Sequence, residues 1–200
     1  LKWTIRLGVI FLAFTFYGFF VDKHYLYGTL FEYSAQFVTP ILFLWYCSGI
    51  YQVRSLRVAK IAISLTFFCH GLFAVGYYPQ PGNFLDMLII GFRVQEGIAR
   101  VMLLDVGLLD FVFAAAVLVP FNLMYYKSMW SKVLKVFFLC LLSYAVVWGF
   151  MTSIARFYIH FNPHFIRQSF EGFFYEFLVR LPHGLLPLIV LLEFSRRKTI

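Results

Sequence analysis

Long, uninterrupted runs of apolar residues constrain the fold of this chain more than any other feature. A helix needs about 20 mostly apolar residues to cross a bilayer core. Six runs meet or approach that length, at 3–21, 37–53, 61–78, 101–125, 136–156 and 177–194. Lipid tolerates only helices or closed barrels, and these runs lack the alternation of barrel strands. The sequence predicts an all-α polytopic membrane protein, one transmembrane domain over residues 1–200, with a four-helix-bundle-like core formed by spans three to six.

The composition supports lipid as the main solvent of the chain. Hydrophobic residues make up 62% of the sequence and charged residues only 13%, whereas soluble domains contain about 25% charged residues. A soluble domain of this size could not bury so much apolar surface. The first run lacks a small-x-small cleavage pattern, so we interpret it as a spanning helix rather than a signal peptide.

One apolar segment, FLDMLIIGF at 84–92, is too short to span a bilayer. We expect it to lie in the membrane interface, to re-enter the bilayer, or to extend the fourth span outward.

The distribution of basic residues predicts the orientation of the spans. With the N-terminus inside, the inner ends and loops hold eleven of the seventeen Lys and Arg residues and almost no acid, in agreement with the positive-inside rule. These eleven residues are Lys2, Arg6, Arg54, Arg57, Lys60, Lys127, Lys132, Lys135, Arg196, Arg197 and Lys198. We therefore expect an integral protein of the bacterial cytoplasmic membrane with both termini cytoplasmic. The net charge of +8 then serves orientation and attraction to anionic lipids, not nucleic-acid binding.

Two ionisable residues are expected to meet deep in the bilayer. His70 lies ten residues from Lys60 at the inner edge of the third span, and Asp110 lies ten residues from Arg100 at the outer edge of the fourth. At 1.5 Å per residue both are about 15 Å deep. An isolated carboxylate in hydrocarbon is costly and usually pairs. We therefore expect His70 and Asp110 to face each other.

A second pair is expected nearer the outer edge. Asp105 and Arg180 lie at comparable depth, and His183 follows between Pro182 and Pro187, which weaken the local helix. The candidate binding or proton site therefore comprises His70, Asp105, Asp110, Arg180 and His183. The same residues also fit a buried polar network that only locks helix packing.

Histidine and cysteine patterns predict no metal or cofactor site. His70 and His183 could ligate a haem from two helices, but their depths differ. His160 and His164 have an i, i+4 spacing suited to a metal, but Pro163 between them favours a solvated loop. No cofactor is therefore predicted, and a quinone or a lipid stays open as a ligand.

The cysteines and the known catalytic motifs add no further site. The cysteines lie inside apolar runs without metal-binding spacing, so we expect Cys47, Cys69 and Cys140 to be buried as small hydrophobes. The sequence contains no phosphate-binding loop, nucleophile elbow or HExxH motif. We expect Glu171 and Glu176 to offset the positive charge of Arg167 on a solvated face.

Two segments resemble the first two helices of the DoxX-like membrane proteins. They are RVAKIAISLTFFCHGLFAVG at 57–76 and GIARVMLLDVGLLDFVFAAAVLVP at 97–120. The shared features are Arg57, the His70–Gly71 pair, and an acidic residue at Asp105 or Asp110, where the family usually has Glu. The resemblance would cover residues 57–194 with two helices added in front. It implies a four-helix core and, in some members, association with quinone-linked or other redox complexes.

Three functions stay open. A loop-poor chain without an enzyme motif favours an accessory, non-catalytic subunit of a larger membrane complex, with other membrane subunits or a second copy as partners; the redox or quinone link follows from the resemblance. The alternative is a small proton-coupled transporter that uses the ionisable cluster. The third is an intramembrane enzyme acting on lipid or quinone, with His183 and Asp105 as acid and base. An internal sequence repeat that relates the third and sixth spans is a further hypothesis, because CHGLFAVG and PHGLLPLI both place His-Gly in an apolar run.

Overall fold

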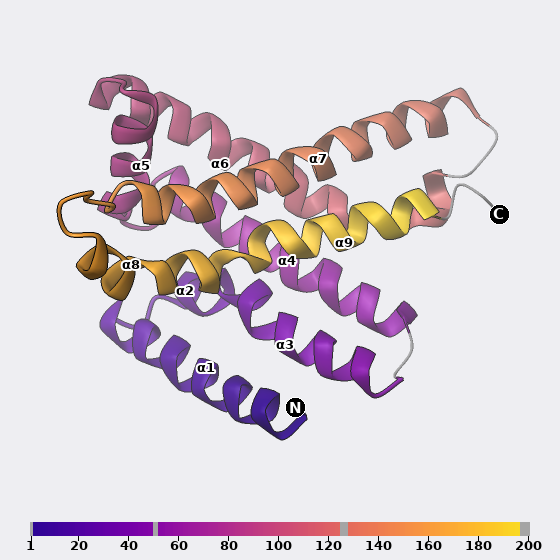
Figure 1. Cartoon of the computed structure of the whole chain (residues 1–200). Coiled ribbons are helices and arrows are strands. Elements are labelled where there is room, and N and C mark those ends of the chain that lie inside the picture. Colours follow the sequence, from indigo (N-terminus) through magenta and orange to yellow (C-terminus); the bar gives the residue numbers. More distant parts are fainter. Residues whose placement is uncertain (1, 50–51, 125–127, 197–200) are drawn as a thin grey trace.

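The computed structural model describes residues 2–49, 52–124 and 128–196, and over these residues the chain is helical without strands. The first half contains α1 (Lys2–Asp22), α2 (Tyr27–Glu32), α3 (Ser34–Cys47), α4 (Gln52–Ala74) and α5 (Gly82–Phe92). The second half contains α6 (Glu96–Leu118), the 3₁₀ turn η1 (Phe121–Met124), α7 (Met129–Tyr158), α8 (Ile166–Arg180) and α9 (Pro182–Arg196). The long helices lie side by side and run alternately in opposite directions (Figure 1).

Five helical segments of the described chain are long and apolar enough to cross a membrane. They are α1, the Arg54–Ala74 part of α4, α6, α7, and the 31-residue stretch Ile166–Arg196 that comprises α8 and α9. The expected second span corresponds to α3, which has only 14 residues. It ends at Cys47 because Gly49 adopts a left-handed conformation, with φ of 69°. These long apolar helices indicate a membrane protein.

The apolar segment at 84–92 forms α5, a separate helix of 11 residues. It starts after Pro81 and ends where Arg93 takes a left-handed φ of 54°. Residues 93–95 are not helical, so the expectation that this segment extends the fourth span is wrong. In Figure 1, α5 lies across the ends of the long helices near α6 and α8.

Buried apolar side chains form two clusters. The larger joins α3, α4, α6, η1, α7 and α9 and includes the fully buried Phe113, Leu142 and Phe194. The smaller joins α4, α5 and α6 and includes Phe73, Leu88 and Leu103. The larger cluster lies toward the ends that carry η1, and the smaller toward the ends that carry α5.

Glycines bring two helix pairs into close contact. On α4, a Cβ at Gly71 would lie 3.0 Å from the carbonyl oxygen of Gly107 on α6. On α7, a Cβ at Gly149 would lie 2.5 Å from the carbonyl carbon of His183 on α9. Small residues at such crossings let helix backbones approach, as is common in membranes. Both crossings lie directly beside a histidine, so they set the positions of the two imidazoles.

The expected burial of the cysteines is only partly correct. Cys69 is buried, Cys47 is half-buried, and Cys140 is exposed on α7. Apolar side chains on the periphery of a membrane protein can face lipid, so burial within the protein is not required of them. His160 and His164 lie in the non-helical segment after α7, as expected, and His160 stacks on Phe173.

Candidate functional site: a polar network beside a cavity

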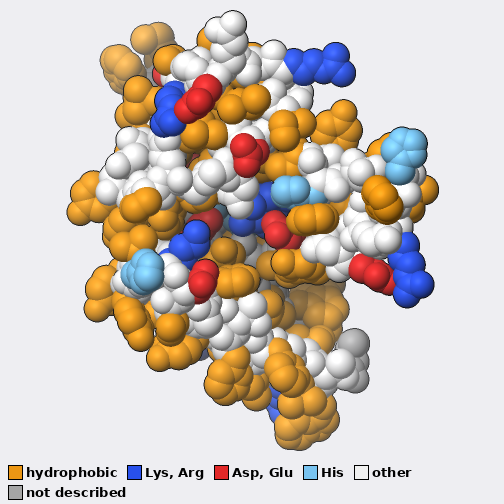
Figure 2. Space-filling model, turned by 90° about the vertical axis from the view of Figure 1, so that its left-hand side faces the viewer, with side chains coloured by type: hydrophobic (Ala, Val, Ile, Leu, Met, Phe, Trp, Pro, Cys, Tyr) orange, Lys and Arg blue, Asp and Glu red, His pale blue; other side chains and the backbone are white. Residues whose placement is uncertain are grey.

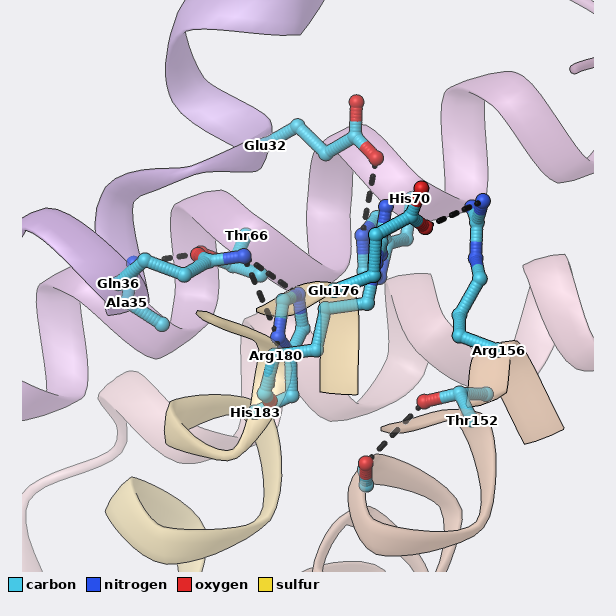
Figure 3. A network of polar contacts seen from close by, with 11 residues as sticks. Glu32, Ala35, Gln36, Thr66, His70, Thr152, Arg156, Glu176, Arg180 and His183 are labelled. Carbon is cyan, nitrogen blue, oxygen red and sulfur yellow. Dashed lines mark hydrogen bonds and ion pairs between the residues drawn. The ribbon is translucent and has the colours of Figure 1, made fainter. Parts of the chain in front are cut away.

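Two buried histidines from distant parts of the sequence stack on each other. The rings of His70 on α4 and His183 on α9 lie 4.9 Å apart between centroids and are inclined by only 3°. Each histidine precedes a glycine that packs closely on a neighbouring helix, Gly71 on α6 and Gly184 against Phe150 of α7. The stacked imidazoles therefore join α4 to α9, while the glycine that follows each histidine packs its helix on α6 or α7 (Figure 3).

Glu32, the last residue of α2, faces this stack. Its Oε1 lies 3.3 Å from Nε2 of His70, an ion-pair distance, although this nitrogen has no partner in hydrogen-bond geometry among the described residues. The residue is 6% exposed and lies outside the five candidate spans. Burial raises the pKa of Glu32, but His70 and the positive charges of Arg180 and Arg156 outweigh it. The pKa of Glu32 is therefore lower than usual, and the carboxylate is charged at neutral pH.

The partners of His183 define its tautomer. Nδ1 lies 3.0 Å from the carbonyl oxygen of Arg180, which can only accept, so Nδ1 carries the proton. Nε2 is then free to accept from the Gln36 amide nitrogen at 3.4 Å. The Gln36 amide nitrogen also lies 3.3 Å from Nδ1 of His183. Because both atoms carry protons in this tautomer, they are in contact but do not form a hydrogen bond. A neutral imidazole thus joins α3 to α9.

Arg156 on α7 closes the network on the side of α8. Its Nη1 lies 3.5 Å from Oε2 of Glu176, and the guanidinium carbon lies 5.9 Å from the ring centre of Phe84 on α5. Arg156 is 4% exposed, and its Nε has no hydrogen-bond partner in the described parts of the chain. The network therefore contains two carboxylates, Glu32 and Glu176, and at least one buried guanidinium.

A cavity that is partly open to the outside adjoins the network. Its polar wall contains His70, Asp110, Thr152 and Arg180. Its apolar wall is formed mainly by α5 and α6, through residues such as Phe84, Met87, Leu103 and Val106, and by Trp148 and Met151 of α7. Ligand pockets typically combine apolar walls with a few polar groups. Figure 2 shows the end of the molecule that carries α5 and α8, where basic, acidic and histidine side chains surround a recessed centre.

His70 and Asp110 line the same cavity but do not form the expected pair. The Asp110 carboxylate instead accepts a 2.8 Å hydrogen bond from the hydroxyl of Tyr144 on α7, and His70 faces Glu32. Their levels along the helices are similar, because Gly71, which follows His70, touches Gly107, one helical turn before Asp110. Their rotation about the helix axes was not predictable from the sequence.

Asp105 lies outside the network. Its side chain is exposed on α6, whereas Asp110 is 1% exposed. The two positions are five residues apart, about 140° around the helix, so only one can face inward. The expected Asp105–Arg180 pair is therefore absent, and neither residue forms an ion pair within the described chain. Asp105 and the buried His183 also do not lie together as an acid and a base.

Sequence reasoning missed Glu32, Gln36, Tyr144, Arg156 and Glu176. Glu176 was expected to balance Arg167 on a solvated face, and Glu32 and Arg156 lie at the edges of apolar runs. Their signal is local: Glu32 and Gln36 are four residues apart and so share one face where α2 leads into α3. Glu176 precedes Arg180 by the same spacing.

The network can hold or move protons and can bind a polar group, but it does not have the geometry of a metal site. Within the described residues, no group of three or more His, Cys, Asp or Glu side chains could hold a metal ion. No family model matches the sequence, and no curated protein or solved structure matches it either. The resemblance to DoxX-like proteins therefore stays a prediction.

Proposed function

We propose that this chain is an accessory, non-catalytic membrane protein that binds a small amphipathic molecule in the cavity between α4, α5, α6, α7 and α8. One observation carries the proposal: a partly open cavity with mostly apolar walls also exposes a few polar and charged side chains. Quinones and single-chain lipids have matching chemistry, with a polar head and an apolar body. The protein would act with other membrane subunits or a second copy in a larger complex, which the DoxX-like resemblance links to redox chemistry.

In this proposal the protein crosses the bacterial cytoplasmic membrane six times, with both ends inside. α3, preceded by α2, would be the second pass, and spans three to six would form the bundle core. The alternating directions of the helices support this topology (Figure 1). The basic residues Lys2, Arg54, Arg57, Lys132 and Arg196 all lie at helix ends that would then be cytoplasmic.

Filling the cavity tests the binding function. Leu103 on α6 is 4% exposed and lines the cavity, so Leu103→Trp would occupy the space. Leu108 on the same helix is 52% exposed, so Leu108→Trp adds the same bulk outside the cavity. We expect native mass spectrometry of protein from lipid nanodiscs to show a retained small molecule in the wild type and in Leu108→Trp. Its retention by Leu103→Trp, or its absence from the wild type, would count against the proposal.

A proton-coupled transporter is the second candidate. The contact of Glu32 with His70, and the stacking of His70 on His183, place three titratable groups in series. Proton relays in membranes use such chains of Asp, Glu and His. Glu32→Gln should then abolish pH-driven flux in proteoliposomes, whereas Glu171→Gln, at an exposed surface ion pair, should not. Equal flux in both variants would exclude this function for the network.

A further inference from the structure

The charges around the cavity are not evenly matched. Arg156 faces Glu176 at 3.5 Å, and Glu32 faces His70 at 3.3 Å. On the cavity wall itself, Asp110 accepts a hydrogen bond from Tyr144, and the Thr152 hydroxyl donates to the Gly149 carbonyl oxygen. Arg180 is different: it lines the cavity, and its guanidinium makes no side-chain hydrogen bond or ion pair within the described residues. Figure 3 shows it among His70, Glu176 and His183.

An arginine in this position calls for an anionic oxygen partner. A guanidinium carries five N–H donors that match a carboxylate or phosphate in two parallel hydrogen bonds. Ionisable side chains within membrane proteins normally pair, because leaving one without a partner is costly. Glu32 is affected by the charge of Arg180 but lies against His70, and Glu176 faces Arg156. Among the described residues, neither carboxylate accepts a hydrogen bond from Arg180, so a ligand is the remaining source of that oxygen.

The position of Arg180 separates the polar and apolar parts of such a ligand. Arg180 lies one helical turn before His183, toward the α8 end, whereas Asp110 lies about one turn beyond Gly107 in the opposite direction. Because the imidazole stack and the Gly71–Gly107 contact share one level, Arg180 and Asp110 lie on opposite sides of it. A head group held by Arg180 thus lies away from Asp110, and Phe84, Met87, Leu103 and Val106 remain for an apolar chain.

We propose that the cavity binds a single-chain amphiphile with an anionic head, a long-chain carboxylate or phosphate monoester, whose oxygens are held by Arg180. This inference rests on the proposed binding function and specifies its ligand class. A neutral or cationic head would leave the Arg180 guanidinium without an anion, so it should bind more weakly. The enclosed space is small, so it favours one chain over a whole diacyl phospholipid.

The test compares four probes with the same twelve-carbon chain: dodecanoate, dodecyl phosphate, dodecanol and dodecyltrimethylammonium. Binding is measured as the shift in thermal unfolding midpoint of the full chain in a neutral maltoside detergent, titrated to give an affinity. We expect the two anions to stabilise the wild type and the alcohol and the cation to bind at least tenfold more weakly. Comparing dodecanoate with dodecyl phosphate then distinguishes the two head groups.

Variants assign the effect to Arg180. A charged hydrogen bond contributes about 1.5–3 kcal/mol, so Arg180→Gln should weaken anion binding about ten- to hundredfold. Arg180→Lys keeps the charge without the bidentate geometry and should recover part of the affinity. The control is Arg100→Gln, because Arg100 is exposed and paired with Glu96 away from the cavity. It should bind like the wild type.

The outcomes separate the two proposals. If the alcohol binds as tightly as the anions, or if Arg180→Gln binds anions like the wild type, the head-group assignment is wrong while cavity binding stands. If none of the probes binds and Leu103→Trp behaves as the wild type with all four, the binding function itself is wrong. Should Arg180→Gln fail to fold, the comparison of Arg180→Lys with the wild type and the order of the four probes still decide the head group.

Discussion

Gly149 tests the packing that supports the network, because it allows α7 to approach the start of α9. A Cβ there would lie 2.5 Å from the His183 carbonyl carbon and 2.6 Å from the Gly184 nitrogen, where ordinary contact begins at 3.4 Å. The two helices must therefore separate by nearly 1 Å in Gly149→Ala, the difference between 2.5 and 3.4 Å. Both obstructing atoms are backbone and cannot rotate away. Overpacking costs about 1–3 kcal/mol, and we expect the upper part of that range.

The assay is thermal unfolding in detergent, followed by tryptophan fluorescence with Trp148 next to the substituted position. For a chain of this length about 1 kcal/mol corresponds to about 2–4 °C, so Gly149→Ala should unfold about 5–10 °C below the wild type. Gly172→Ala is the matched control, since Gly172 lies inside α8 with no atom within 4 Å of an added Cβ. Helix propensity alone should leave Gly172→Ala unchanged or stabilise it by up to about 1 kcal/mol. Equal midpoints for the wild type and Gly149→Ala would refute the close crossing of α7 and α9.

Three further predictions concern the network. Because the pKa of Glu32 is lowered in the folded state, its charge stabilises the fold above about pH 4.5, and this stabilisation is lost as the pH falls further. The unfolding midpoint of Glu32→Gln should therefore depend less steeply on pH below about 4.5 than the midpoint of the wild type. Tyr144→Phe leaves the buried Asp110 without its donor and should destabilise the protein by about 1–3 kcal/mol in denaturant titrations; a loss below 0.5 kcal/mol would show that this bond contributes little. Asp105→Asn, at an exposed position, should change the same free energy by no more than about 0.5 kcal/mol.

The sequence predicts the helical, membrane-protein class of this fold well, because the length of an apolar run, which decides whether a helix can cross a bilayer, is read directly from the local composition. It predicts the bounds of α3 less well. The run at 37–53 continues as an apolar pattern, but a left-handed Gly49 ends the helix at Cys47. Glycine conformation depends on context that composition does not contain.

The candidate site shows what one-dimensional depth can and cannot provide. Counting residues from the charged edges placed His70 and Asp110 at matching levels, which the Gly71–Gly107 contact supports. Residue counts along a span do not determine which neighbour each side chain faces, because the rotation of a helix about its axis depends on packing with helices that are distant in sequence. The two His-Gly pairs were visible as a shared dipeptide, yet only the fold shows that the imidazoles stack.

The arrangement of polar and apolar regions favours binding over transport. The cavity is lined by residues of α5 and by Arg180 at the end of α8, and these two helices lie at the same end of the molecule (Figure 1). Beyond them, Phe121, Phe138 and Phe194 pack edge-to-face with ring centres 4.9–5.7 Å apart within the larger core cluster. A carrier must expose its site to both sides in turn, which here would require η1, α7 and α9 to separate and these three rings to lose their contacts. A protein that holds a molecule from one side needs no such opening, and a closed aromatic cluster then serves as the rigid base of the site.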